Sequence, residues 1–205
     1  MNQNAAGMQS LHGDSTDGRW LGRAPVAFLT SNSGVEQVEL TTPWKAVNDA
    51  GGEPVLIAPQ RARVRTVIDD VEPGAEFDAS LSVSQARAAD FAGVVVPGGV
   101  ANPDPLRLEP DAVAFVRSAV EAGVPIASIC HGPWMLVEAG VLAGKTLTSW
   151  PSLATDIRNA GGNWKDAEVV TCTANDWTLV TSRRPDDLPA FDEAMLAAVA
   201  ARQQQ

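Results

Sequence analysis

Cys130 stands at the point in this chain where an apolar, β-branched run ends and a helical pattern begins. The run covers residues 124–129 (VPIASI), and residues 131–139 have helical spacing. A side chain at such a strand-to-helix turn projects from the carboxyl edge of a sheet, and free N–H groups at the start of the helix favour a thiolate. We therefore expect Cys130 to be a nucleophile with a lowered pKa, although a lone cysteine is more often a small buried hydrophobic residue.

Neighbouring residues could supply the other groups that thiolate chemistry needs. His131 could move protons near neutral pH, whereas His12 lies in a polar stretch far upstream. Residues 94–99 (VVVPGG) end a second apolar run, and the N–H of Gly99 could hold an oxyanion together with the N–H of His131. On spacing alone, His131 could also be a surface histidine, and the two glycines a simple turn.

Alternating strands and helices must position these residues. The pattern predicts strands at 25–30, 54–58, 91–96, 124–129, 147–149, 168–173 and 178–181, helices at 36–50, 111–122, 131–139, 152–160 and 188–202, and a hairpin or excursion over 64–84. Such alternation is typical of a mostly parallel sheet covered by helices on both faces. Loops 31–36, 97–105 and 130–134 would then meet at the carboxyl edge, where ligands bind.

Composition limits the classes of partner and chemistry. A chain of 205 residues with 45% hydrophobic residues suits one domain, which we place at residues 25–205 after a polar extension of residues 1–24. The net charge of −10 disfavours nucleic acid, and no signal peptide or membrane-length apolar run is present, so we expect a cytoplasmic protein. Two cysteines and two histidines predict neither a disulfide framework nor a metal site, and no cofactor motif is complete.

The motifs around Cys130 resemble a known family. Residues 127–133 (ASICHGP), with 94–99 (VVVPGG) upstream, look like the PfpI-type intracellular protease and stress-protein family of the DJ-1/PfpI superfamily. Residues 35–40 (VEQVEL), 159–162 (NAGG) and 179–188 (LVTSRRPDDL) extend the resemblance over most of residues 25–200. A true glutamine amidotransferase is disfavoured, since that chemistry needs a downstream histidine and none follows His131.

The resemblance implies a flavodoxin-like, three-layer α/β sandwich and assigns roles within it. It implies that Cys130 is the nucleophile, that Glu36 lies beside its sulfur, and that Gly99 helps to form the oxyanion pocket. It further implies a homodimer or higher homo-oligomer, in which Asp104 of an adjacent subunit reaches His131. Asp104 could equally be a turn residue between two prolines.

The resemblance also places two tryptophans, Trp134 and Trp150, at the expected pocket. Trp134 occupies a position where relatives commonly carry a smaller polar side chain, so we expect a narrower or more apolar pocket. Trp150 matches an aromatic residue near the pocket mouth of relatives, although it could equally belong to the core.

Two functional hypotheses follow. The first is a cysteine-dependent stress enzyme that acts on reactive carbonyls such as methylglyoxal, on their protein adducts, or on peptides. The second is a non-catalytic redox sensor or chaperone-like protein in which Cys130 is oxidised to a sulfinate. Cys172 lies in an apolar run and is expected to be a core residue rather than a partner in oxidation.

Overall fold

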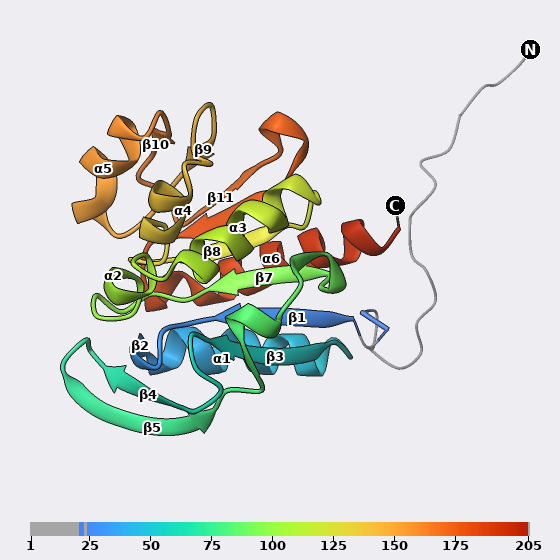
Figure 1. Cartoon of the computed structure of the whole chain (residues 1–205). Coiled ribbons are helices and arrows are strands. Elements are labelled where there is room, and N and C mark those ends of the chain that lie inside the picture. The colour runs from blue at the N-terminus through green and yellow to red at the C-terminus, as the bar shows by residue number, and fades with distance from the viewer. Residues whose placement is uncertain (1–20, 23, 205) are drawn as a thin grey trace, which may run out of the picture.

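A seven-stranded sheet forms the centre of the computed structural model, which describes residues 21, 22 and 24–204 (Figure 1). The strand order is β11-β12-β8-β7-β1-β3-β6, and all neighbours are parallel except β11 and β12. Most of the predicted extension, residues 1–24, lies outside the described residues. The strands are β1 (Pro25–Leu29), β3 (Glu53–Ala58), β6 (Leu81–Ser82), β7 (Gly93–Val96), β8 (Ile126–Ile129), β11 (Val169–Cys172) and β12 (Leu179–Ser182).

Helices cover both faces of this sheet, which makes the α/β sandwich that the sequence predicts. Strands β7 and β8 are buried along their whole length, as central parallel strands are. On one face pack α3 (Pro110–Glu121), α4 (Trp134–Ala139) and α5 (Ala154–Asn159); on the other pack α1 (Gln37–Asp49) and α6 (Leu188–Gln203). Within the described residues, no helix is both long and apolar enough to span a bilayer.

The helices turn regularly spaced apolar faces toward the sheet. In α6 the buried positions are Leu188, Phe191, Met195 and Val199, which recur every three or four residues and so lie on one side of a helix. The buried residues of α3 follow the same rule. Two apolar cores result, one on each face of the sheet.

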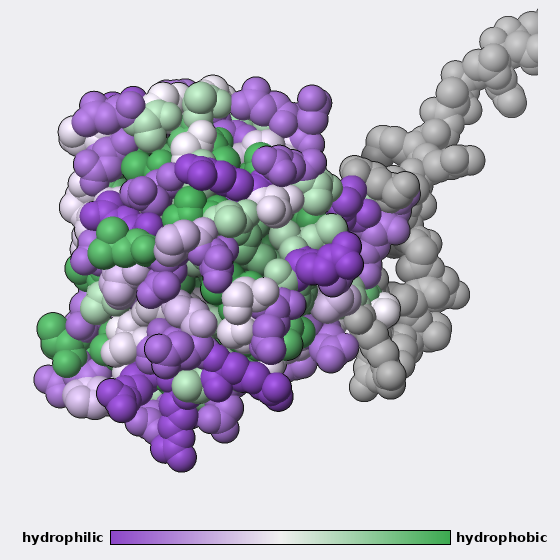
Figure 2. All heavy atoms as spheres, in the orientation of Figure 1, coloured by the Kyte–Doolittle hydropathy of each residue, from purple (hydrophilic) through white to green (hydrophobic). Residues whose placement is uncertain are grey.

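The predicted excursion after β3 is a hairpin that extends from the carboxyl edge. Strands β4 (Arg63–Ile68) and β5 (Glu72–Asp78) are antiparallel, and β4 pairs with the short β2 (Ser33–Glu36). Figure 2 shows hydrophilic side chains gathered over this region, at the bottom of the view. Three residues connect the paired Ile68 and Glu72, and two of them, Asp69 and Asp70, have left-handed φ values of 51° and 65°, as tight hairpin turns require.

Two helices begin later than the sequence predicts. Helix α1 begins at Gln37 rather than at Glu36, because Glu36 is the last residue of β2. Helix α4 begins at Trp134 rather than at His131, because Cys130 has φ 59° and residues 131–133 form a turn. The N–H groups near Cys130 therefore come from a tight turn and not from the first turn of a regular helix.

Short elements fill the remaining connections. The predicted helix over 152–160 divides into a 3-10 turn and α5, and the predicted strand over 147–149 is shorter and pairs with a strand that the sequence did not indicate. The short helix is α2 (Pro103–Leu106), and the short strands are β9 (Thr146–Leu147) and β10 (Asn163–Trp164). The 3-10 turns are η1 (Val83–Gln85), η2 (Ala88–Asp90), η3 (Pro151–Leu153), η4 (Ala174–Asp176) and η5 (Pro185–Asp187).

The loop between β12 and α6 is held by one buried carboxylate. Asp187 is 3% exposed and accepts hydrogen bonds from the backbone N–H and the guanidinium of Arg183. Burial by itself would raise the pKa of Asp187, but these bonds bring it below its usual value. The carboxylate thereby fixes the turn that contains Pro185.

We expect Asp187→Ala to lower the free energy of unfolding by about 2–3 kcal/mol, because it leaves charged and backbone donors of Arg183 without an acceptor. The neighbouring Asp186 is exposed and carries the same charge, so Asp186→Ala is the matched control and should change stability by less than about 0.5 kcal/mol. Urea denaturation of both variants measures the difference. Equal losses in the two variants would contradict this role of Asp187.

Candidate active site around Cys130

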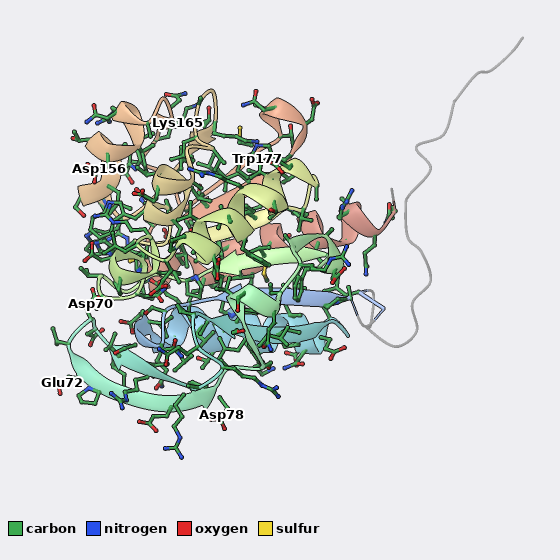
Figure 3. All side chains as sticks on the ribbon, in the orientation of Figure 1. Asp70, Glu72, Asp78, Asp156, Lys165 and Trp177 are labelled. Carbon is green, nitrogen blue, oxygen red and sulfur yellow. The ribbon has the colours of Figure 1, made fainter. Side chains whose placement is uncertain are left out.

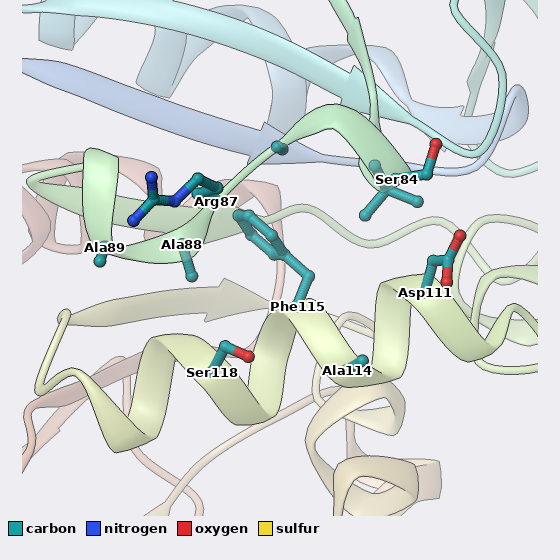
Figure 4. Close-up of a pocket in the computed structure, with 10 residues that line it drawn as sticks. Ser84, Arg87, Ala88, Ala89, Asp111, Ala114, Phe115 and Ser118 are labelled. Carbon is teal, nitrogen blue, oxygen red and sulfur yellow. The ribbon is translucent and has the colours of Figure 1, made fainter.

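Cys130 lies directly after β8, at the carboxyl edge of the sheet, and faces a pocket of about 260 Å³. A larger cavity of about 370 Å³ lies between α3 and residues 83–89 (Figure 4), but neither a cysteine nor a histidine lines it. We therefore take the smaller pocket as the candidate site. Its lining residues are Glu36, Glu39, Asp69, Asp70, Cys130, Trp150 and Pro185.

The left-handed backbone of Cys130 is held by hydrogen bonds on both sides. Its N–H donates to the carbonyl of Ser182 at 3.1 Å, and its carbonyl accepts from the N–H of Trp150 at 2.8 Å. A non-glycine residue with φ 59° is strained, so the surrounding structure must compensate for it. The bonds from β12 and from the chain before η3 provide that restraint.

The 97–99 loop approaches the Cys130 turn closely because Gly98 has no side chain. A Cβ at Gly98 would lie 2.6 Å from Cβ of Cys130, 2.6 Å from Oε2 of Glu39 and 2.9 Å from the backbone nitrogen of His131. Gly99 has φ 84°, and its N–H, like that of His131, hydrogen-bonds to the sulfur of Cys130. The structure thus brings together the two N–H groups that the sequence analysis assigned to an oxyanion pocket.

The carboxyl beside the thiol belongs to Glu39, which corrects the expectation that Glu36 occupies this place. Glu39 is fully buried, and its Oε2 accepts from the N–H of Gly98 at 2.8 Å. Its Oε1 has no hydrogen-bond partner among the described residues. Burial raises the pKa of Glu39 to about 8. At neutral pH this carboxyl is therefore mostly protonated.

Glu36 lines the same pocket but binds the hairpin. Its two carboxylate oxygens accept hydrogen bonds from the N–H groups of Asp69 and Asp70, at 3.3 and 3.0 Å. Burial raises its pKa. Glu36 and Glu39 contact different parts of the site because β2 continues to Glu36. The first turn of α1 then places Glu39, rather than Glu36, beside Cys130. The spacing of Glu36 and Glu39, three residues apart in a predicted helix, was the available signal for a second carboxyl.

Burial raises the pKa of the Cys130 thiol well above its usual range, and the charge of Glu39 raises it further. The hydrogen bonds from Gly99 and His131 lower it but do not offset burial. The expected lowering of the Cys130 pKa is therefore wrong, because burial is the largest influence on this thiol. Because Glu39 is mostly protonated at neutral pH, it does not repel a thiolate at Cys130 at that pH. Glu39 and Cys130 together then carry at most one negative charge.

The imidazole of His131 lies against the sulfur. Its Nδ1 is 3.3 Å from Sγ of Cys130, a contact that adjacent residues rarely make. The ring stacks on Trp150 at 5.8 Å and lies 5.4 Å from the ring of Trp134. Burial among these rings lowers the pKa of His131, so the ring is neutral near pH 7 and can accept a proton.

The two tryptophans have different places. Trp150 lines the pocket and is 37% exposed, whereas Trp134 is outside the lining and contacts His131 with its ring tilted by 54°. The indole N–H of Trp134 donates to Asp156 at 2.9 Å, and the guanidinium of Arg107 lies 5.0 Å from its ring centre. Trp134 is thus held in position by two polar groups.

Among the described residues, Asp104 forms no hydrogen bond or ion pair with His131 of its own chain. It is an exposed residue of α2 whose carboxylate pairs with Arg107, at 3.1 Å. Its contact with the histidine of a second subunit stays a prediction. Cys172 lies in β11, partly buried, and its sulfur accepts a hydrogen bond from the N–H of Thr146 at 3.3 Å.

The fold and this site place the protein among α/β sandwich proteins with a cysteine and a histidine at the carboxyl end of a central strand. The DJ-1/PfpI family model matches residues 24–198, and the chain belongs to this family. It is 36% identical to general stress protein 18 of Bacillus subtilis, over 79% of this chain and 90% of that protein. It is 38% identical to Deglycase PH1704 of Pyrococcus horikoshii, over 81% of this chain and 93% of that protein.

Solved structures share the fold. A two-domain protein from Anabaena variabilis, with DJ-1/ThiJ/PfpI-like and ferritin-like domains, is similar with a TM-score of 0.76 and 33% identity; the match covers 85% of this chain and 47% of that longer one. A ThiJ/PfpI domain protein from Brachyspira murdochii matches with a TM-score of 0.76 and 17% identity, over 86% and 96% of the two chains. The second likeness concerns the fold alone.

The raised pKa of Glu39 makes stability depend on pH. Between about pH 5 and pH 8 the native protein holds a proton at Glu39 that the unfolded chain has released, so the free energy of unfolding falls as pH rises, by up to about 1.4 kcal/mol per pH unit. Burial also raises the pKa of Asp192 to about 7. Asp192 therefore also makes the free energy of unfolding fall as pH rises.

We therefore expect Glu39→Gln, made in an Asp192→Asn background, to flatten the curve of unfolding free energy against pH over this range. Glutamine is neutral at every pH and still offers an oxygen to the N–H of Gly98. Urea denaturation at a series of pH values measures the slopes. Parallel curves with and without the Glu39 substitution would show that this carboxyl is ionised in the folded protein.

Proposed function

We propose that the protein is a cysteine-dependent enzyme that acts on reactive carbonyls or on their protein adducts, as a stress-response function. The contact between Nδ1 of His131 and the sulfur of Cys130 carries this proposal, because it gives a buried thiol a neutral base at 3.3 Å. The similarity to a protein named as a deglycase supports this substrate class, and the similarity to a general stress protein supports the stress-response role.

The proposed first step is addition of the thiol to a carbonyl. The sulfur of Cys130 forms a bond to the carbonyl carbon while Nδ1 of His131 accepts the thiol proton. The electron pair of the C=O double bond moves to oxygen, and the N–H groups of Gly99 and His131 stabilise that oxyanion. The proton then returns from His131 to the oxygen, which yields a hemithioacetal.

The neutral carboxyl of Glu39 favours this step. A protonated Glu39 does not repel the charge that develops on sulfur or oxygen, whereas an ionised one would. Glu36 is a positioning residue in this scheme, since its carboxylate holds the hairpin turn rather than the thiol.

Loss of methylglyoxal, followed by NMR, tests the proposal. We expect Cys130→Ala to reduce turnover to the rate of buffer, and His131→Ala to reduce it by about a hundredfold or more. Cys172→Ser, which keeps the acceptor for Thr146, is the matched control and should leave the rate unchanged. Equal rates for native protein and Cys130→Ala would eliminate the enzyme hypothesis. Parallel assays with an arginine adduct of methylglyoxal and with a fluorogenic peptide distinguish the three substrate classes.

One observation favours a second candidate function, a redox sensor. Oε1 of Glu39 is buried without a hydrogen-bond partner among the described residues, and a protonated carboxyl there could donate to an oxygen added to Cys130. Such a hydrogen bond would stabilise a sulfinate at Cys130 against further oxidation to a sulfonate.

Under mild peroxide we expect Cys130 to gain two oxygen atoms, measured by mass spectrometry of the intact protein and its peptides. Glu39→Gln retains a donor and should give the same product, whereas Glu39→Leu should reduce its yield several-fold because the donor is lost. If mild peroxide adds no oxygen to Cys130 in the native protein, the sensor hypothesis fails.

A further inference from the structure

The pocket in front of Cys130 has an unusual charge composition. Four of its seven lining residues are acidic, namely Glu36, Glu39, Asp69 and Asp70, and none is Lys or Arg. The one residue that could carry a positive charge at the site, His131, is neutral near pH 7 because burial lowers its pKa. Because Glu39 is mostly protonated at neutral pH, the negative charge that an entering substrate meets comes mainly from the exposed Asp69 and Asp70.

The exposed part of this charge comes from the hairpin turn, which is tied to the site at two points. The carboxylate of Glu36 accepts the N–H groups of Asp69 and Asp70, and Oδ1 of Asp70 accepts the N–H of Val100 at 2.7 Å. Figure 3 shows Asp70 at the end of the hairpin nearest α2, with Asp78 at the far end of β5. The two aspartates are thus held at the mouth of the pocket, although they lie more than fifty residues before Cys130 in the chain.

The carboxylates suit an organic cation better than a metal ion. In the part of the chain that the structure describes, no three His, Cys, Asp or Glu side chains converge as metal ligands do. Trp150 also lines the pocket and is 37% exposed, and an indole ring is the strongest aromatic partner for an ammonium or guanidinium group. Acidic groups and an aromatic ring therefore line the same pocket, a combination that suits a positive charge.

We propose that Asp69 and Asp70 determine the substrate charge that the Cys130 pocket accepts: electrophiles with an ammonium or guanidinium group close to the reacting carbon react preferentially, and anionic ones such as 2-oxo acids are rejected. This selectivity refines the proposed function and rests on Cys130 being the attacking group. Glu36 and Trp150 act with the two aspartates, the first by holding the turn and the second by contacting the cation.

Charged thiol reagents test the selectivity without turnover. The probes are trimethylammonioethyl methanethiosulfonate, which is cationic, and sulfonatoethyl methanethiosulfonate, which is anionic. Their rate ratio at Cys130 is measured in a Cys172→Ser background and divided by the ratio for free mercaptoethanol. Because both probes react with the same thiolate, the ratio does not depend on the pKa of Cys130.

At low salt we expect a normalised ratio of about tenfold or more in favour of the cation. Opposite unit charges about 6 Å apart in water change a rate by about threefold, so removal of one carboxylate should lower the ratio by up to about tenfold. Asp69→Asn and Asp70→Asn are suitable because asparagine tolerates the left-handed backbone and keeps an acceptor oxygen for Val100. Added salt should reduce the ratio in the native protein.

Asp78→Asn is the matched control, since it removes the same charge from the far end of the same hairpin and should leave the ratio close to the native value. A normalised ratio near one, or a ratio that neither substitution at the turn lowers, overturns the proposal. An equal fall in Asp78→Asn also overturns it, because the net charge of the protein would then be responsible.

The experiments distinguish a failure of the proposed enzyme function from a failure of the proposed charge selectivity. If Cys130 discriminates between the probes as expected but carbonyl turnover does not require it, the proposed function fails and the charge selectivity stands. If turnover requires Cys130 but the probes react without preference, the enzyme hypothesis stands and the selectivity fails.

Discussion

The close approach of the Gly98 backbone to the Cys130 turn is the constraint on which the rest of the site depends. It brings the N–H of Gly99 to the sulfur and the N–H of Gly98 to the carboxyl of Glu39. Any larger residue at position 98 would contact both side chains at 2.6 Å. The left-handed backbone of Cys130 is part of the same arrangement, because it turns the thiol toward these donors and leaves His131 free to contact it.

Desolvation governs the chemistry of this pocket. Burial raises the pKa of Glu39 and of Cys130 and lowers the pKa of His131, so all three groups tend toward their neutral forms. A proton that moves from the neutral thiol to the neutral imidazole leaves the net charge of the pocket unchanged, because the thiolate and the imidazolium form as an ion pair in contact. A thiolate then arises as the proton moves to His131, rather than as a permanent state of the free protein.

The hairpin connects this buried chemistry to the solvent. Its turn lies outside the sandwich, yet Glu36 and the N–H of Val100 bind it to the edge of the pocket. The charge that an approaching molecule meets is therefore carried by a segment separate from the one that carries the nucleophile. Substitutions in the turn can alter what enters without altering the reacting groups.

The sequence by itself determined the parallel sandwich and the place of Cys130 at the end of a central strand, because apolar periodicity and glycine-containing turns are local properties. For residues 64–84 it left a hairpin or another excursion open. It also brought Gly99 and His131 into consideration as neighbours of the thiol. Only the tertiary structure decided that Glu39 rather than Glu36 contacts Cys130, since this depends on where β2 ends and α1 begins. The pKa values and the position of the Asp69–Asp70 turn also required the fold, because burial and approach across the sheet edge arise only when distant segments pack together.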